Sequence, residues 1–148
     1  MEYGEVKLNR NSAMKVYEWC KKKYGRSKYN GRYPDLRYRK EDYVTEGLIG
    51  LYDEFDNIIF INSDAINTLE DLIVTVIHEY VHYTQNIRVD WKVLSKYFDP
   101  TSMDHPLERQ AEEISIRDFP TCLQEVFGIS HLDKENTEQA SNIFIDNG

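Results

Sequence analysis

His78, Glu79 and His82 form an HExxH motif, a spacing that suits metal binding and hydrolysis. On a helix, residues four apart share one face about 5 to 6 Å from each other, so both imidazoles can reach one ion. Zinc accepts neutral imidazole nitrogens, and catalytic zinc sites take three protein ligands and a water. Glu79 stands about 100° further round such a helix than His78, beside the ion. Because zinc lowers the pKa of its water to roughly 7, Glu79 is suited to act as the general base.

The alternative interpretation is a chance pattern on a buried helix, with both histidines satisfied by ordinary hydrogen bonds. At average residue usage this motif should arise by chance in roughly one chain in a hundred or fewer of this length. Cysteine ligands and a disulfide framework are not indicated, because Cys20 and Cys122 lie far apart and form no CxxC pair. We therefore expect a single zinc ion per chain, held by histidine and carboxylate ligands.

Two histidines leave a catalytic zinc ion one protein ligand short, so a later segment must supply it. Residues 105–112 are typical of a helix that carries Glu108 at the edge of an apolar face. Glu112, four residues further on, is placed to hold the outer nitrogen of a ligating imidazole. His105 has two open interpretations. It is either a group that stabilises an oxyanion or a surface histidine at the helix terminus, and we favour the second.

Alternating hydrophobic residues and turn signals predict three short strands after an initial helix. That helix is capped by Asn11 or Ser12 and ends at Gly25. A polar turn over residues 53–56 joins the last two strands as an antiparallel hairpin, and the strands cover residues 36–40, 46–52 and 57–62. We therefore expect a small mixed or antiparallel three-stranded sheet packed on the N-terminal helix.

Helical periodicity marks the metal-binding segment and two segments after it. The HExxH motif falls in residues 69–85, whose start at Asn67 and Glu70 resembles a capping box. Asp90 is expected to cap a short helix, and residues 104–106 open a later, glutamate-bearing helix. The predicted fold class is thus α+β, with a central HExxH helix followed by the glutamate helix.

An ExxAE sequence begins 26 residues after His82, and together with HExxH it resembles the gluzincin metallopeptidases. The match runs from the hairpin to about Phe119. The small size of this region is similar to that of the minigluzincins and of the small phage or ImmA/IrrE-type peptidases. The resemblance implies a zincin-like fold, with His78, His82 and Glu108 as zinc ligands and Glu79 as the base.

In this family an edge strand just before the metal helix pairs antiparallel with the substrate backbone. An ordinary sheet strand is the alternative interpretation of the segment at that position here. The resemblance implies substrate binding by Asn57, Ile58, Ile59, Phe60, Ile61 and Asn62.

The sequence departs from two patterns of related metallopeptidases. No residue matches the tyrosine or histidine that donates to the oxyanion in gluzincins, so that role stays open among Tyr97, His105 and the other tyrosines. Arg88 stands where metzincins carry a third histidine, which excludes that class.

The chain has 148 residues, of which 41% are hydrophobic. This composition is typical of one domain with a hydrophobic core. We expect a metallopeptidase domain over residues 1–128 and a polar tail over residues 129–148, in which His131 is a surface residue. The polar start lacks a signal-peptide core, and no apolar run approaches the roughly 20 residues of a membrane span. We therefore expect a cytoplasmic protein with no membrane contact.

The function predicted from these patterns is a zinc metallopeptidase that cleaves peptide or protein substrates through a zinc-bound water activated by Glu79. A zinc-stabilised regulatory or binding module without catalysis is an alternative. Latency, in which tail residues such as Asp133 or Glu135 occupy the cleft, is a further hypothesis.

A nucleic-acid partner is the other alternative. Residues 21–40 hold nine of the 18 lysines and arginines and a single acid, Asp35, so this segment carries +8 and the remainder −16. Interleaved tyrosines make the segment a candidate docking arm, as in a DNA-associated protease resembling the Spartan type. We favour a solvated basic face that pairs with the acidic remainder.

Overall fold

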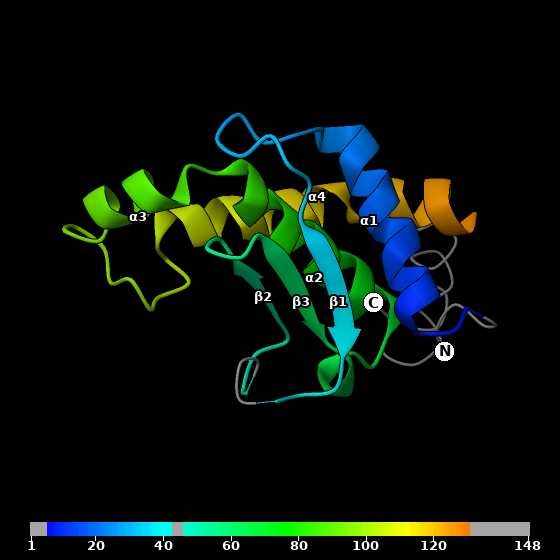
Figure 1. Ribbon diagram of the computed structural model, residues 1–148. Helices are drawn as coiled ribbons and strands as arrows, with labels where there is room; N and C mark the ends of the chain where they lie inside the picture. Colours follow the sequence, from blue (N-terminus) through cyan, green and yellow to red (C-terminus); the bar gives the residue numbers. More distant parts are fainter. Residues whose placement is uncertain (1–5, 43–45, 131–148) are drawn as a thin grey trace, which may run out of the picture.

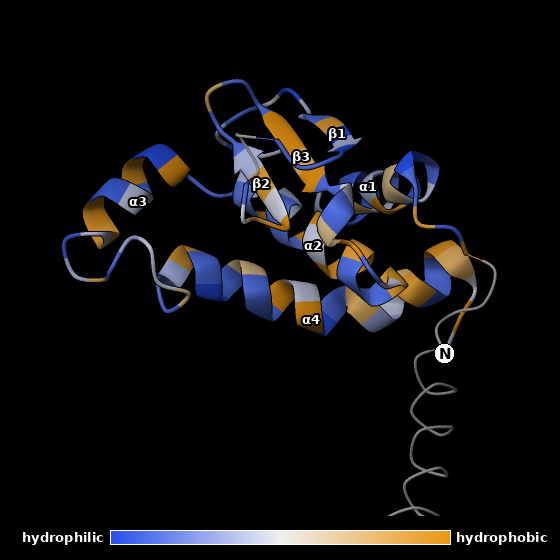
Figure 2. Cartoon of the chain, turned by 90° about the horizontal axis from the view of Figure 1, so that it is seen from below, coloured by the Kyte–Doolittle hydropathy of each residue, from blue (hydrophilic) through white to orange (hydrophobic). Residues whose placement is uncertain are grey.

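The structure is a computed structural model that describes residues 6–42 and 46–130. Seen from below, the sheet, α2 and α4 follow one another as layers (Figure 2). The arrangement confirms the predicted α+β class with a mixed sheet. Within the described ranges the order of elements is α1 (Arg10–Tyr24), β1 (Asp35–Arg39), β2 (Gly50–Asp53), β3 (Ile58–Asn62), the 3-10 helix η1 (Ser63–Ala65), α2 (Leu69–Thr84), α3 (Ile87–Leu94) and α4 (Pro106–Phe127) (Figure 1).

Some predictions concern residues outside these ranges. The tail predicted over residues 129–148 is described only at its first two residues, and His131, Asp133 and Glu135 lie beyond it. Among the described helices, none combines the length and the apolar character that a bilayer crossing requires. Cys20 and Cys122 are both free and buried.

β3 is the central strand of the sheet, with β1 on one side and β2 on the other. β1 runs parallel to β3, with Leu36 opposite Ile59, and β2 runs antiparallel, with Tyr52 opposite the same residue. The predicted hairpin is therefore confirmed. Its first strand begins at Gly50 and not at residue 46.

This strand order shows that residues 57–62 do not form an edge strand, so the predicted substrate-binding strand is wrong. β3 pairs with a neighbour on each side, and four of its five residues are buried. The position of this strand just before α2 in the sequence does not show whether it lies at the edge of the sheet, because strand order depends on pairings between distant segments. The edge on the side of α2's histidines is β2. No free ladder of backbone groups is available to a substrate at Asn57, Ile58, Ile59, Phe60, Ile61 and Asn62.

α2 begins at a capping box one residue later than the predicted one. The Thr68 hydroxyl accepts from the Asp71 N–H at 3.0 Å, and the Asp71 carboxylate accepts from the Thr68 N–H at 3.2 Å. The prediction of Asn67 and Glu70 was wrong because neighbouring residues of similar chemistry satisfy the same pattern.

The other two caps also differ from their predictions. α1 is capped by Asn9, which forms a capping box with Ser12, so the predicted start at Asn11 or Ser12 is too late. α3 begins at Ile87, and Asp90 lies inside it instead of capping it. The predicted end of α1 at Gly25, which has a φ of 76°, is confirmed.

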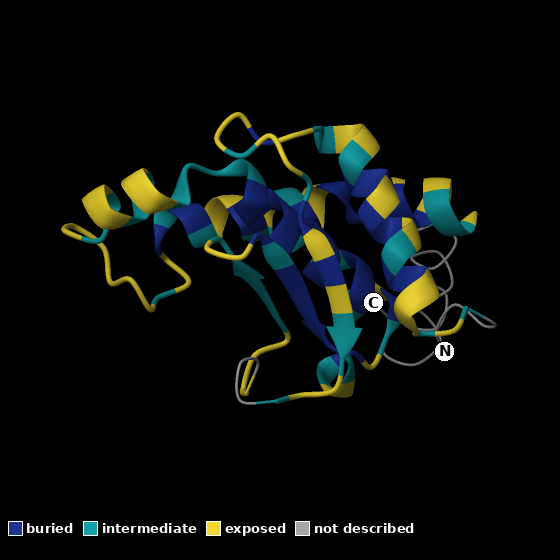
Figure 3. Cartoon of the chain, viewed as in Figure 1, coloured by how far each residue is buried: buried dark blue, intermediate teal, exposed yellow. Residues whose placement is uncertain are grey.

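α2 is the element around which the core is built. Its apolar face is covered by the sheet, α1 and α4, and it is largely dark blue in Figure 3. Burying one leucine, isoleucine or valine side chain stabilises a fold by roughly 1.5 to 3 kcal/mol. The position of α2 is therefore fixed by side chains with no exposed surface, namely Leu72, Ile73, Val76, Ile77 and Tyr80.

Gly50 marks the place where β2 approaches α2 most closely. A Cβ atom at this residue would lie 2.7 Å from the Thr75 methyl carbon and 3.2 Å from Cγ of Glu79. Only glycine lets the strand and the helix come this near.

We predict that Gly50→Ala destabilises the fold by about 1 to 3 kcal/mol, because the added methyl overpacks this contact. Thr75→Ser in the same chain removes the clashing methyl and recovers part of the loss. Urea unfolding measures both effects, with Gly31→Ala as the control because nothing lies within 4 Å of that Cβ position. Equal stability of Gly50→Ala and the parent would show that the contact is not tight.

Candidate metal centre

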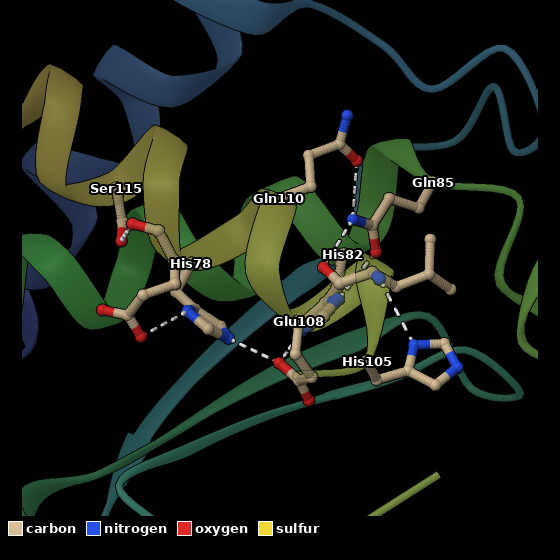
Figure 4. A network of polar contacts seen from close by, with 9 residues as sticks. His78, His82, Gln85, His105, Glu108, Gln110 and Ser115 are labelled. Carbon is tan, nitrogen blue, oxygen red and sulfur yellow. Dashed lines mark hydrogen bonds and ion pairs between the residues drawn. The ribbon is translucent and has the colours of Figure 1, made fainter. Parts of the chain in front are cut away.

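His78 and His82 from α2 converge with Glu108 from α4 (Figure 4). Nε2 of each histidine lies 2.9 Å from Oε1 of Glu108. One ligand atom from each of the three residues lies within 4.8 Å of the other two. The structure thus brings together the three residues that the sequence suggested as metal ligands.

The three donors fit a tetrahedral zinc ion. Bond lengths of about 2.0 to 2.1 Å place the ligand atoms of such a site roughly 3.3 Å apart, a few tenths of an ångström more than the N···O distances here. The Glu108 side chain is partly exposed and can adjust by that amount. Two imidazole nitrogens and one carboxylate oxygen leave the fourth position for a water or a substrate oxygen.

The charges of the three residues are strongly coupled. Hydrogen bonds from His78 and His82 hold the pKa of the Glu108 carboxyl well below its usual range, against the opposing effect of burial. Burial alone would lower the pKa of His82, but the bond to Glu108 and the charges of Glu79 and Glu108 outweigh it and raise that pKa. His82 contacts acceptors with both nitrogens, which only the protonated ring can satisfy. A cation at this point would replace the proton on Nε2 of His82.

Gln85 positions the ring of His82, a role that the sequence did not predict. Its Oε1 lies 2.7 Å from His82 Nδ1, while its Nε2 donates to the Leu107 carbonyl at 3.0 Å and to Gln110 Oε1 at 2.8 Å. Because the amide nitrogen faces two oxygen acceptors, the amide oxygen must face His82. Nδ1 therefore carries a proton, and Nε2 is the nitrogen left to bind a metal.

Glu112 lies behind His78, as the sequence suggested, but it is not hydrogen-bonded to it. Its Oε2 is 3.9 Å from His78 Nδ1, within reach of an ion pair and beyond a direct hydrogen bond. The carboxylate lies one turn after Glu108 on α4, where it adds negative charge beside the cluster.

Glu79 is only 7% exposed. It lines two cavities beside the cluster, one along residues 47–50 at the start of β2 and the other further along β2 near Tyr52 and Trp91. Burial raises the pKa of its carboxyl, and the nearby His82 and His78, together with a hydrogen bond from the Tyr52 N–H, act in the opposite direction. A carboxylate that is poorly solvated and close to the cluster has the proton affinity expected of a general base.

His105 is neither a surface residue nor an oxyanion donor, so both predictions for it are wrong. It is completely buried, its ring stacks on Trp91 at a centroid distance of 4.1 Å, and its Nδ1 accepts from the Leu107 N–H. His105 is the N-cap of α4, and its ring packs against Trp91 of α3. Tyr97 is 79% exposed and lines neither cavity. The tyrosine that does line one, Tyr52, donates its hydroxyl to Asn57 Oδ1.

Comparisons with known proteins leave the chain unassigned: no family model, no curated protein and no solved structure matches it.

We predict that Gln85→Leu lowers zinc affinity about 10- to 100-fold, because His82 loses the acceptor that fixes its tautomer. Competition against a fluorescent zinc chelator measures the affinity. Gln124→Leu, the same change on an exposed part of α4, serves as the control and should bind zinc like the parent. Parental affinity in Gln85→Leu would show that this amide does not support the site.

Proposed function

We propose that this protein is a zinc-dependent metallopeptidase of the HExxH…E type, with a zincin-like arrangement of its edge strand, metal helix and glutamate helix. The observation that carries the proposal is the buried Glu79 carboxylate beside the cluster of His78, His82 and Glu108, at the open edge of the sheet. The resemblance to gluzincins supports the same interpretation.

Each residue has a defined part in such a reaction. His78, His82 and Glu108 would hold the zinc ion, which when bound supplies a Lewis acid and lowers the pKa of water. Glu79 takes a proton from the attacking water and delivers it to the departing amine nitrogen. Its hydrogen bond from the Tyr52 N–H keeps the carboxylate in place between β2 and the cluster.

β2 provides the edge on which an extended peptide can lie. The Asn62 N–H donates to the Ile49 carbonyl, so Ile49 directs its backbone groups toward β3. In an antiparallel pair every second residue does so, and Leu51 and Asp53 therefore also direct their backbone groups toward β3. The backbone groups of Gly50 and Tyr52 therefore face away from the sheet. The Tyr52 N–H is already engaged by Glu79, so a substrate strand would pair with the backbone groups of Gly50 and the carbonyl of Tyr52, and it would pass beside Glu79.

Two tyrosines of the basic segment, Tyr24 and Tyr33, are engaged by neighbouring side chains, which weighs against their use as a stacking surface for a nucleic-acid partner. Lys21 and Arg26 both lie against the ring of Tyr33, at 4.9 and 5.1 Å from its centroid. Tyr24 donates its hydroxyl to Asp118 at 2.7 Å, which leaves Tyr29 as the exposed ring. This packing supports a structural role for the segment and favours the peptidase over a DNA-associated protease.

We predict that the zinc-loaded protein cleaves an unfolded protein such as reduced casein, and that Glu79→Gln slows cleavage about 100- to 10,000-fold by removing the base. Cleavage is followed by mass spectrometry of the fragments. Glutamine keeps the size of the side chain, so the zinc content should stay at the parental level.

The matched control is Glu113→Gln, an exposed residue of α4 that lines neither cavity and should keep parental activity. Full activity in Glu79→Gln, or activity that survives complete metal removal, would rule out the proposed chemistry.

A further inference from the structure

The cavity near Tyr52, about 310 Å³ in volume, brings apolar side chains close to the candidate metal cluster. Glu79, His82 and Glu108 line one part of it. Other parts are lined by apolar side chains from α3, from β2 and from the residues just before β2, namely Leu48, Leu51, Ile87 and Trp91. A substrate held at the cluster therefore has apolar surface within the same cavity.

Trp91 contributes the largest of these side chains, and packing covers only part of it. The ring stacks on His105 at a centroid distance of 4.1 Å and an interplanar angle of 16°, so one of its faces is covered. The residue is half-buried, and it lines the cavity. Because one face lies against His105, the surface that Trp91 presents to the cavity is the opposite face or the ring edge.

His105 fixes the orientation of the Trp91 ring relative to the metal cluster. It is completely buried, and its Nδ1 accepts from the Leu107 N–H at 3.2 Å. Its Nε2 lies 3.4 Å from the hydroxyl of Ser95, the residue that follows α3. The same histidine is the N-cap of α4, whose first turn carries Glu108. The wall formed by Trp91 is thus attached to the helix that supplies a candidate metal ligand, and such a preformed wall loses little entropy on binding.

The stack on His105 also anchors α3, which contributes no buried residue to the core. Anchoring uses one face of the Trp91 ring and does not require the rest of the ring to lie in a cavity. Its position in the wall of the cavity, beside Glu79 and His82, is a separate observation. Exposed aromatic surface next to a reactive cluster points to a ligand with an apolar group.

The charged groups of this cavity already have partners. Glu54 forms an ion pair with Arg88 at 3.9 Å, and Glu108 contacts both histidines of the cluster. Glu79 accepts a hydrogen bond from the Tyr52 N–H. The lining surface that remains for recognition of a substrate side chain is therefore apolar.

We propose that Trp91 determines the specificity of this site by receiving a large apolar or aromatic side chain of the substrate. This specificity rests on the proposed peptidase function. An aromatic side chain pairs with a tryptophan ring in an offset-stacked or edge-to-face arrangement, and such a pair contributes more than the burial of its apolar area. Leu51 and Ile87 add aliphatic surface around the same space.

Strand direction places this side chain before the cleaved bond. A peptide that adds to β2 as an antiparallel strand, the more stable pairing, runs from Asp53 toward Gly50. The cavity with Trp91 extends to Tyr52 and Glu54, whereas the other cavity lies along residues 47–50. The amino-terminal part of the peptide therefore meets Trp91. The substrate class is an extended peptide with a large apolar residue on the amino-terminal side of the cleaved bond.

Binding of two hydroxamates tests this specificity without turnover. Acetyl-phenylalanine hydroxamate and acetyl-alanine hydroxamate carry the same zinc-binding group in place of the cleaved bond, so their side chains lie on its amino-terminal side. The zinc-loaded protein should bind the phenylalanine compound about tenfold tighter, because its ring adds buried apolar area and an aromatic contact. Isothermal titration calorimetry measures both affinities.

Three variants locate the effect. Trp91→Leu keeps an apolar side chain against His105, and it should reduce the preference to about threefold or less while the alanine compound binds as to the parent. Ile87→Ala leaves the Trp91 ring in place and should also reduce the preference. Tyr97→Leu removes an exposed ring outside the cavity and is the control.

Equal binding of the two compounds to the parent, or an unchanged preference in Trp91→Leu, would overturn the role of Trp91. If Trp91→Leu also weakens binding of the alanine compound, the preference of Ile87→Ala decides, and a parental value there overturns the apolar site. No binding of either compound to the zinc-loaded parent contradicts both the specificity and the proposed function.

Mapping the cleavage sites in an unfolded protein separates the specificity from the proposed function. The zinc-loaded parent should cut after phenylalanine, tyrosine and leucine more often than after small or acidic residues, and Trp91→Leu should lose the preference for aromatic residues. Cuts without any preference contradict the role of Trp91 alone. A complete lack of cutting contradicts the peptidase function, while the hydroxamate titration still decides what Trp91 contacts.

Discussion

The structure depends on the burial of α2. One face of this helix has no exposed surface because the sheet, α1 and α4 cover it, and this fixes the rotation of the helix about its own axis. With the rotation fixed, His78 and His82 face α4, where Glu108 lies within hydrogen-bond distance of both. Glu79 faces β2, where the Tyr52 N–H meets it. The apolar core thus brings a costly group of partly buried charges into one place, and a cation would compensate them.

Local signals in the sequence predicted the α+β class of the fold and the two histidines of the candidate metal cluster. The HExxH helix, the hairpin and the glutamate helix each follow from periodicity and turn residues within one segment. The convergence of Glu108 with the histidines agrees with the family resemblance, although spacing alone could not show it. The exact caps were missed, because Asn67 and Thr68 are both good caps and tertiary packing decides between them.

Features that depend on distant segments could not be predicted. The position of β3 at the centre of the sheet follows from its parallel pairing with β1, which no local pattern encodes. Gln85 follows the last residue of α2, and its contact with His82 requires the backbone of α4 to lie opposite. His105 has the polarity of a surface residue, yet it is buried because Trp91 stacks on it. In each case a side chain acquires its role only after two elements have packed.

A crystal structure of the zinc-soaked protein tests most directly whether α2 and α4 hold one ion between them. Anomalous diffraction recorded at the zinc edge should show one strong peak about 2.0 to 2.2 Å from Nε2 of His78, Nε2 of His82 and a carboxylate oxygen of Glu108. Glu79 should lie beside the peak without binding to it. A map with no peak at this position, or with Glu108 turned into solvent while the ion sits elsewhere, would contradict the account.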